Sequence, residues 1–315
     1  MSVLTFRGGT HPYDGKALSR DAAIEEIKPG EELVFPLSQH IGAPAVPIVE
    51  IGERVLAGQK IAAKSGFISA NIHSSVSGTV IKIEPRTIAT GGKVNSIIIR
   101  NDNLYEQAPP INDKNPDDMT DDEIRTVIEE AGIVGMGGAG FPTNVKLTPK
   151  NPEVIDTIIV NGAECEPYLT SDYRRMLEYT DELVKGLKIV LRLFPGARGV
   201  FGVEDNKPEA IKALKKATSG ENNIEVAVLK TKYPQGGERC MIKAVTGREI
   251  NSKMLPADAG CIVHNIDTIA SIYQAVYEGR PLTRRIVTVT GDAVNSTHNY
   301  YVYLGTNMRV LIDAA

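Results

Sequence analysis

The sequence predicts an α/β protein in which a small β-rich domain precedes a parallel α/β domain. Up to about residue 100, short apolar runs such as Glu32-Leu33-Val34-Phe35 are broken by Gly and Pro, which is typical of a small barrel or sandwich. From Thr120 to Glu278, helix and strand signals alternate instead, and this alternation indicates a parallel sheet.

In the second region, Thr120 and Glu123 form a capping-box pattern, and Gly132 stands where the helix should end. The predicted strands cover residues 154–160, 199–203, 224–229 and 261–263, and the predicted helices cover residues 172–194, 206–217, 238–245 and 265–278. A polar, Pro-containing linker over residues 101–116 separates this region from the first. Residues 285–290 predict a further strand, and residues 308–312 look like another opening strand of a new module. We therefore expect a truncated form of a longer protein.

Composition narrows the classes of function. The 315 residues carry 35 Lys and Arg against 39 Asp and Glu, a net charge of −4, which argues against a dominant nucleic-acid surface. No apolar run reaches the roughly 18 residues of a membrane-spanning helix. The three cysteines, Cys165, Cys240 and Cys261, lie far apart, which favours a reducing compartment and excludes a four-thiolate iron–sulfur cluster from this chain alone.

Glycine is densest over Gly135–Thr143, where Gly135, Gly137 and Gly140 match G-x-G-x-x-G. A Rossmann fingerprint lies between a strand and a helix, whereas a capped helix precedes this segment, so we reject that interpretation. Residues without Cβ still let the backbone approach a flat or phosphorylated ligand, and Lys146 could reach a phosphate. The alternative is a tight turn that packs a helix on the sheet.

Three further segments follow predicted strands or open predicted helices: Asn161–Pro167, Tyr233–Arg239 and His264–Thr268. Ligands bind at the carboxyl ends of strands in open α/β sheets, so these segments predict one rim. Each alone could be a solvated loop or a helix cap. We predict neither a catalytic thiol at Cys165, because its acidic neighbours would raise the pKa, nor a metal site, because no ligand spacing occurs.

These motifs resemble a known family. Gly135–Lys146 is similar to the flavin loop of the NADH-binding flavoprotein subunit of respiratory complex I. Its other flavin and NADH segments resemble, in the same order, Asn161–Pro167, Gly237-Glu238 and Asn265–Thr268. The resemblance is closer to the C subunits of Rnf electron-transport complexes, which share Phe6–Pro12 and Tyr233–Arg239. It covers essentially all 315 residues.

The resemblance implies FMN and NADH as cofactors, bound by a Rossmann-like domain. It assigns the FMN phosphate and ring to Gly135, Gly137, Gly138, Gly140 and Lys146. It assigns the rest of the FMN site to Asn161, Glu164, Tyr233, Gly237, Glu238, Asn265 and Thr268. Phe141 would stack near the nicotinamide or adenine, and Glu166 would accept from NADH. Ala163, Cys165 and Arg239 depart from the complex I pattern, which has Asp, Ser and Glu there.

The first region resembles biotinyl/lipoyl barrels at Val55–Ala62 and His73–Val80. Lys64, near the expected hairpin tip at Ser65–Ala70, lacks the flanks of a modified lysine, so we interpret a structural barrel. The predicted domains are a barrel over residues 1–105, an FMN/NADH-binding domain over residues 106–280, and the start of a β-grasp module over residues 281–315. The family's ferredoxin-like domain, with its 4Fe-4S clusters, is expected only in a missing C-terminal part.

The resemblance implies that NADH reduces FMN and that electrons pass singly to iron–sulfur centres. The partners would be NADH, other Rnf subunits and, indirectly, ferredoxin, with no nucleic acid, at the cytoplasmic face of the membrane as a peripheral subunit. No side-chain acid or base is expected to be catalytic. The alternative is a non-catalytic scaffold, for which the A subunit of the Na+-pumping NADH:quinone reductase, which resembles this architecture, is the example. A carrier barrel bearing biotin or lipoate is disfavoured by the missing flanks of Lys64.

Overall fold

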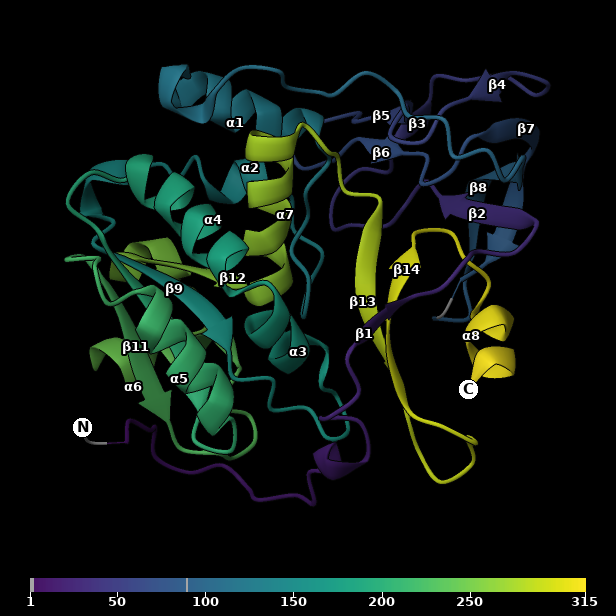
Figure 1. The fold of residues 1–315 in the computed structure, drawn as a ribbon. Coiled ribbons are helices and arrows are strands. Elements are labelled where there is room, and N and C mark those ends of the chain that lie inside the picture. Colours follow the sequence, from purple (N-terminus) through teal and green to yellow (C-terminus); the bar gives the residue numbers. More distant parts are fainter. Residues whose placement is uncertain (1–2, 89) are drawn as a thin grey trace. The chain divides into compact units, whose positions relative to one another are not determined.

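The computed structural model describes residues 3–88 and 90–315 (Figure 1). Contacts group these residues into two units. The α/β unit comprises the chain up to Ile24, Leu147–Tyr273 and Thr290–Asn299, and the barrel unit comprises Glu25–Lys146, Gln274–Val289 and Tyr300–Ala315. The chain therefore passes between the units several times, whereas the sequence suggested three successive domains.

A four-stranded parallel sheet forms the centre of the α/β unit. Its strands are β9 (Thr157–Gly162), β10 (Arg198–Glu204), β11 (Ile224–Leu229) and β12 (Cys261–Asn265), in the order β11-β10-β9-β12. After β11 the chain therefore returns past β10 and β9 to place β12 on the other side of β9. This reversal creates a topological switch point between β9 and β12, where Asn161 and Asn265 are register partners at the strand ends.

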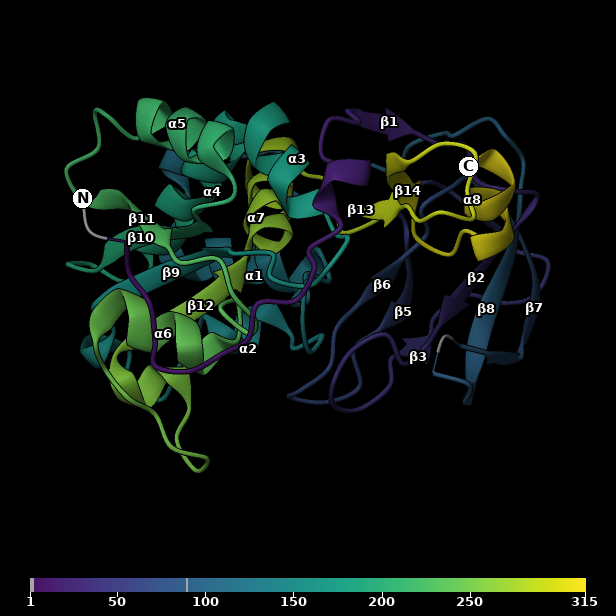
Figure 2. The same cartoon turned by 90° about the horizontal axis from the view of Figure 1, so that it is seen from below.

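Helices cover both faces of this sheet (Figure 2). They are α3 (Ser171–Glu178), α4 (Thr180–Arg192), α5 (Pro208–Ala217), α6 (Glu238–Thr246) and α7 (Ile266–Glu278). A Cβ at Gly199 would meet Leu187 of α4, whereas one at Gly202 would meet Met241 of α6. Because side chains alternate along a strand, α4 and α6 lie on opposite faces. The single helix predicted over residues 172–194 is wrong: Tyr179, with φ −130° and ψ 34°, divides it into α3 and α4.

The barrel unit contains two antiparallel sheets. One has the order β2 (Glu32–Pro36), β8 (Lys93–Asn101), β7 (Gly78–Thr87), β4 (Arg54–Val55), and the other has β3 (Val46–Pro47), β5 (Lys60–Ala63), β6 (Ile72–His73). Apolar side chains of the strands alternate toward a shared core, in which Leu33, Phe35, Ile61 and Val80 are fully buried. The predicted barrel is thus confirmed.

The glycine-rich segment belongs to the barrel unit. It follows α1 (Asp121–Glu130), where the predicted capping box is present and Gly132 has φ +66°. It leads into the single-turn helix α2 (Thr143–Lys146). The amide of Ile41 donates to Gly140 O at 2.9 Å, so the barrel holds the segment from one side.

The final residues form β13 (Arg284–Val289), β14 (His298–Tyr303) and α8 (Met308–Ala314), and a three-stranded sheet has the order β1 (Ile24–Glu26), β14, β13. The strand predicted over residues 308–312 is wrong, because this run is helical. Asn307 caps the helix by accepting a hydrogen bond from the Arg309 amide. Across the described residues, no helix has both the length and the apolar character needed to span a membrane.

Gly186 lets α4 approach α7 closely. A Cβ at this position would lie 2.4 Å from the backbone oxygen of Ile269. We expect Gly186→Ala to reduce the free energy of unfolding by about 2 kcal/mol through overpacking. Denaturant unfolding checks this, with Gly220→Ala as the matched control, because a Cβ at Gly220 meets nothing within 4 Å. Equal stability of the two variants would contradict the prediction.

His73 makes the barrel unit sensitive to acid. Burial, and then the charge of Lys60, lower the pKa of His73 from 6.5 to about 3, and within the described residues neither ring nitrogen has a hydrogen-bond partner. The pKa of His73 is lower in the folded state than in the unfolded state, so the buried neutral ring contributes to the free energy of unfolding above pH 6.5. This contribution is lost as the pH falls toward 3. Between pH 7 and pH 5 we expect the wild type to lose about 2 kcal/mol more than His73→Gln in denaturant unfolding. Parallel losses would refute this.

Candidate functional site

The switch point gathers polar side chains at the carboxyl ends of β9 and β12. Asn161 Nδ2 donates to Gly236 O at 2.7 Å, and its Oδ1 accepts from the Ala163 amide at 3.1 Å. Asn265 Nδ2 donates to Asp172 Oδ2 at 2.7 Å, while its Oδ1 accepts from the Asp267 amide at 2.8 Å at the start of α7. The two asparagines thus fix the loops around the switch point.

The loop after β9, residues 163–170, is joined to the segment before α6. The amide of Gly236 donates to Cys165 Sγ at 3.3 Å. Interaction with the Glu166 carboxylate raises the pKa of the Tyr233 hydroxyl. Both Glu166 and Tyr233 are exposed. The structure therefore brings together three segments that the sequence predicted as one rim.

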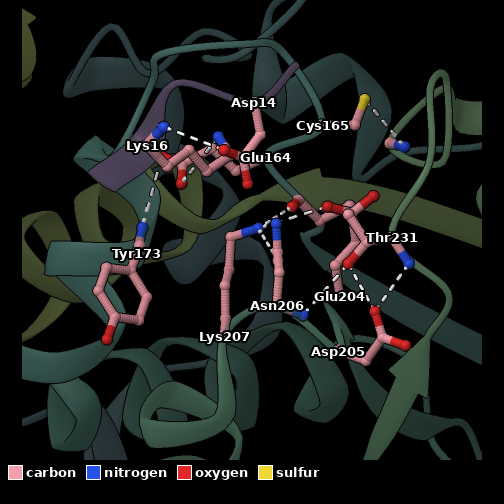
Figure 3. Close-up of polar contacts among 12 residues, drawn as sticks. Asp14, Lys16, Glu164, Cys165, Tyr173, Glu204, Asp205, Asn206, Lys207 and Thr231 are labelled. Carbon is pink, nitrogen blue, oxygen red and sulfur yellow. Dashed lines mark hydrogen bonds and ion pairs between the residues drawn. The ribbon is translucent and has the colours of Figure 1, made fainter. Parts of the chain in front are cut away.

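Beneath this loop lies a buried charge cluster of Lys16, Glu164, Glu204 and Lys207 (Figure 3). Lys207, 2% exposed, follows β10 and donates from Nζ to Ala163 O at 2.6 Å and to Asn206 Oδ1 at 2.9 Å. Its Nζ also lies 3.4 Å from Glu204 Oε2, while Glu204 Oε1 accepts from the Lys232 amide at 3.3 Å. Burial raises the pKa of Glu204.

Lys16, in the N-terminal 3₁₀ turn Lys16–Leu18, reaches the same loop from a segment far earlier in the chain. Its Nζ donates to Leu169 O at 2.5 Å and to Glu166 O at 3.0 Å, and lies 3.8 Å from Glu164 Oε2. Burial lowers the pKa of Lys16 and raises the pKa of Glu164. The second oxygen of Glu164 accepts from the Asp172 amide at 2.7 Å, at the N-terminus of α3.

The predicted rim residues divide by exposure. Asn161, Glu166, Tyr233, Gly237, Glu238 and Asn265 are at least partly exposed. Glu164 and Thr268, which the resemblance assigns to the flavin site, are buried. In this structure the Glu164 side chain organises the loop, because its oxygens are directed at the N-terminus of α3 and at Lys16.

The glycine-rich segment presents bare backbone to solvent. The amide of Gly135 donates to Phe141 O at 2.8 Å, and Val134 pairs with Pro142, so the loop is closed at its base. Gly137 has φ +85°, a conformation that favours glycine, and both Gly137 and Gly138 are exposed. A Cβ at Gly138 would meet no protein atom within 4 Å. The space is therefore open to a ligand that approaches the backbone, and the segment fits a flat or phosphorylated group.

Sequence analysis missed Lys16, Glu204 and Lys207. Residues 204–207 follow the strand predicted over residues 199–203. Ligands bind at the carboxyl ends of strands in open α/β sheets, so these residues also qualified as candidates. Lys16 gave no local signal, because it lies 150 residues before Glu166, whose carbonyl it contacts.

Comparison with known proteins finds a family model for the α/β region and another for the barrel region. Residues 128–274 match the family model of the Nuo51 FMN-binding domain, and residues 4–104 match that of the RnfC barrel sandwich hybrid domain. The NAD+-reducing [NiFe]-hydrogenase in its air-oxidised state shares the fold, with a TM-score of 0.55, 23% identity, and coverage of 62% of this chain and 39% of that one. The two family models define the class of protein as one in which an RnfC-type barrel domain precedes an FMN-binding domain.

Curated relatives specify the family. The C subunit of the proton-translocating ferredoxin:NAD(+) oxidoreductase complex of Clostridium ljungdahlii is 44% identical over 98% of this chain and 68% of its own length. The C subunit of the Na(+)-translocating complex of Acetobacterium woodii is 43% identical, over 98% and 70%. The chain belongs to the family of RnfC proteins, the C subunits of ion-translocating oxidoreductase complexes.

Lys207 and Glu204 depend on each other because both are buried. Lys207→Met leaves Glu204 as an uncompensated buried carboxylate, and we expect it to cost about 3–5 kcal/mol in the free energy of unfolding. Adding Glu204→Gln removes that charge, so the double variant should be more stable than Lys207→Met alone. A double-mutant cycle of urea unfolding measures this. Additive single effects would rule out the coupling.

Proposed function

We propose that this chain oxidises NADH through bound FMN and passes the electrons to iron–sulfur centres of its complex. The observation that supports this most directly is the switch point. The register of β9 and β12 places Asn161 beside Asn265 within a domain that matches an FMN-binding family. Open α/β sheets bind their ligands at this position.

For FMN, we propose the residues of the glycine-rich segment and of the rim. In the segment, Gly135, Gly137, Gly138 and Gly140 allow close backbone approach, and Lys146 contributes positive charge toward the phosphate. In the rim, the partly exposed Asn161, Tyr233, Gly237, Glu238 and Asn265 would contact the flavin. The buried Glu164 and Thr268 would support these contacts from beneath.

For NADH, we propose Glu166 and Phe141. Glu166 is exposed and its carboxylate interacts with the Tyr233 hydroxyl, so it lies at the rim, where it can accept from a nucleotide hydroxyl or amide. Phe141, half-buried after the glycines, offers a ring for stacking.

Bound FMN would supply the chemistry, since a flavin accepts a hydride and releases single electrons. The residues of this chain bind and orient. Carboxylate and amide side chains of the protein would hold the nucleotide, and no titratable side chain has to transfer a proton. Hydride transfer requires closeness and alignment above all, which explains a site built on backbone and fixed amides.

The relatives' names describe multi-subunit ion-translocating complexes, and we propose the same assembly for this chain, at the cytoplasmic face of the membrane. NADH would be its soluble substrate and ferredoxin an indirect partner through other subunits. The two curated relatives described above extend beyond the region they share with this chain. We place the 4Fe-4S clusters in such further sequence.

Gly138 tests the FMN assignment without disturbing the fold. We expect the wild-type chain to retain FMN after removal of the excess. Gly138→Ala should raise the dissociation constant for FMN about tenfold or more, because its Cβ enters the space of the ligand. Flavin fluorescence titration measures this constant. Gly220→Ala is the matched control, since its Cβ also meets open space. Equal affinities would exclude this segment from the site, and a wild type that binds no FMN would favour the scaffold alternative.

Glu166 tests the NADH assignment. In the FMN-loaded chain under anaerobic conditions, NADH should bleach the flavin. With ferricyanide as the electron acceptor, Glu166→Gln should raise KM for NADH about tenfold or more, since a hydrogen bond to a charged group contributes about 1.5–3 kcal/mol. The affinity for FMN should stay unchanged. Glu209→Gln, an exposed carboxylate on α5, serves as the control. If wild-type flavin bound but were not bleached, NADH would not be the donor.

A further inference from the structure

The N-terminal segment over residues 4–20, here called the strap, contacts two of the rim segments. It lies beside β11, where the Leu4 amide donates to Val228 O at 2.8 Å. Thr10 and Tyr233 then exchange two backbone hydrogen bonds, each 2.8 Å long. Lys232 Nζ donates to Gly8 O at 2.8 Å. The strap is therefore fixed along the edge of the sheet up to the Tyr233 segment.

The strap next reaches the loop over residues 163–170. The Tyr168 amide donates to Asp14 O at 2.6 Å, and the hydroxyls of Ser19 and Thr170 are 2.8 Å apart. Between these contacts, Lys16 Nζ donates to the carbonyls of Glu166 and Leu169. One ammonium group thus holds two backbone positions of the loop, including that of Glu166.

This loop needs such support. Glu164 and Tyr168 have φ of +48° and +67°, a region that side chains other than glycine rarely adopt. Strained residues persist only where surrounding contacts over-determine them. Lys207 provides one contact at Ala163 O, and the strap provides those at Glu166, Tyr168 and Leu169.

We propose that Lys16 is a positioning residue for the nucleotide site: it holds the loop over residues 163–170 in its strained conformation and so fixes the Glu166 carboxylate for NADH. The inference rests on the proposed function for the role of Glu166, but the positioning itself does not. The Glu166 carboxylate also interacts with the Tyr233 hydroxyl, and the strap holds the Tyr233 backbone through Thr10. The strap therefore holds the backbone of both Glu166 and Tyr233.

The experiment uses the full 315-residue chain and compares Lys16→Met, Lys16→Arg and Leu187→Ala. Lys16→Met removes the ammonium group, whereas Lys16→Arg keeps a charged donor. Leu187→Ala is the stability control, since Leu187 is fully buried on α4 and has no part in the loop. The first readout is amide hydrogen exchange over residues 163–170 without FMN. The second is KM and kcat for NADH in the FMN-loaded chain, with ferricyanide as the electron acceptor.

In Lys16→Met we expect exchange in the loop to accelerate about tenfold or more. We expect its KM for NADH to rise about tenfold, with kcat within about threefold of wild type, because nucleotide binding is lost while the flavin chemistry is kept. Lys16→Arg should restore KM to within about threefold of wild type. Leu187→Ala should lower the unfolding midpoint without either effect.

Loop exchange in Lys16→Met that matches wild type, or a KM change no larger than that of Leu187→Ala, would overturn the inference. If the wild type neither binds FMN nor oxidises NADH, the proposed function fails, and the exchange data alone decide whether Lys16 positions the loop. If Lys16→Met does not fold, Gly15→Ala replaces it. A Cβ at Gly15 would lie 2.4 Å from the Tyr168 ring, so this variant pushes the strap off the loop and keeps the charge. Unchanged exchange in Gly15→Ala would likewise refute the positioning role.

Discussion

The α/β unit depends on how two buried ammonium groups are neutralised. Lys16 and Lys207 lie under the loop after β9, and their partners are the carboxylates of Glu164 and Glu204 together with backbone carbonyls of the loop. A buried charge without partners is strongly unfavourable, so each of these groups fixes the others. The result is a loop whose backbone follows a strained path at the carboxyl end of β9, beside the topological switch point between β9 and β12.

Ligand binding at the switch point, as proposed above, would require rigidity more than reactive side chains. A bound flavin would carry the redox chemistry, so the surrounding chain would have to hold two flat ligands in alignment. The asparagines at the ends of β9 and β12 serve this need by tying strand ends to neighbouring loops. The glycine-rich segment serves it differently, by leaving the backbone uncovered. The asparagine amides would orient a ligand, and the glycines would allow it to approach the backbone closely.

Local patterns predicted much of this architecture. The strand over residues 224–229 and the helix that ends at Glu278 were predicted with nearly the observed bounds, because apolar runs and turn residues mark them clearly. The rim followed from the strand ends. Two errors have local causes: a short apolar run such as residues 308–312 fits a strand or a helix equally, and nothing in residues 172–194 announces the break at Tyr179. The pairing of Lys16 with the loop was beyond prediction, since no local period connects residues so distant in sequence.

The position of the strap has a consequence for the order of events during synthesis. Synthesis runs from the N-terminal to the C-terminal side, and Glu166, whose carbonyl Lys16 contacts, lies 150 residues after Lys16, so the loop emerges well after the strap. The strands of the two barrel sheets, by contrast, all lie within residues 32–101 and can pair while the rest is still being made. The strap is therefore made before the loop that it contacts and can reach its final place only after that loop has emerged. Until then Lys16 cannot be buried beneath the loop and lacks the partners that it has there.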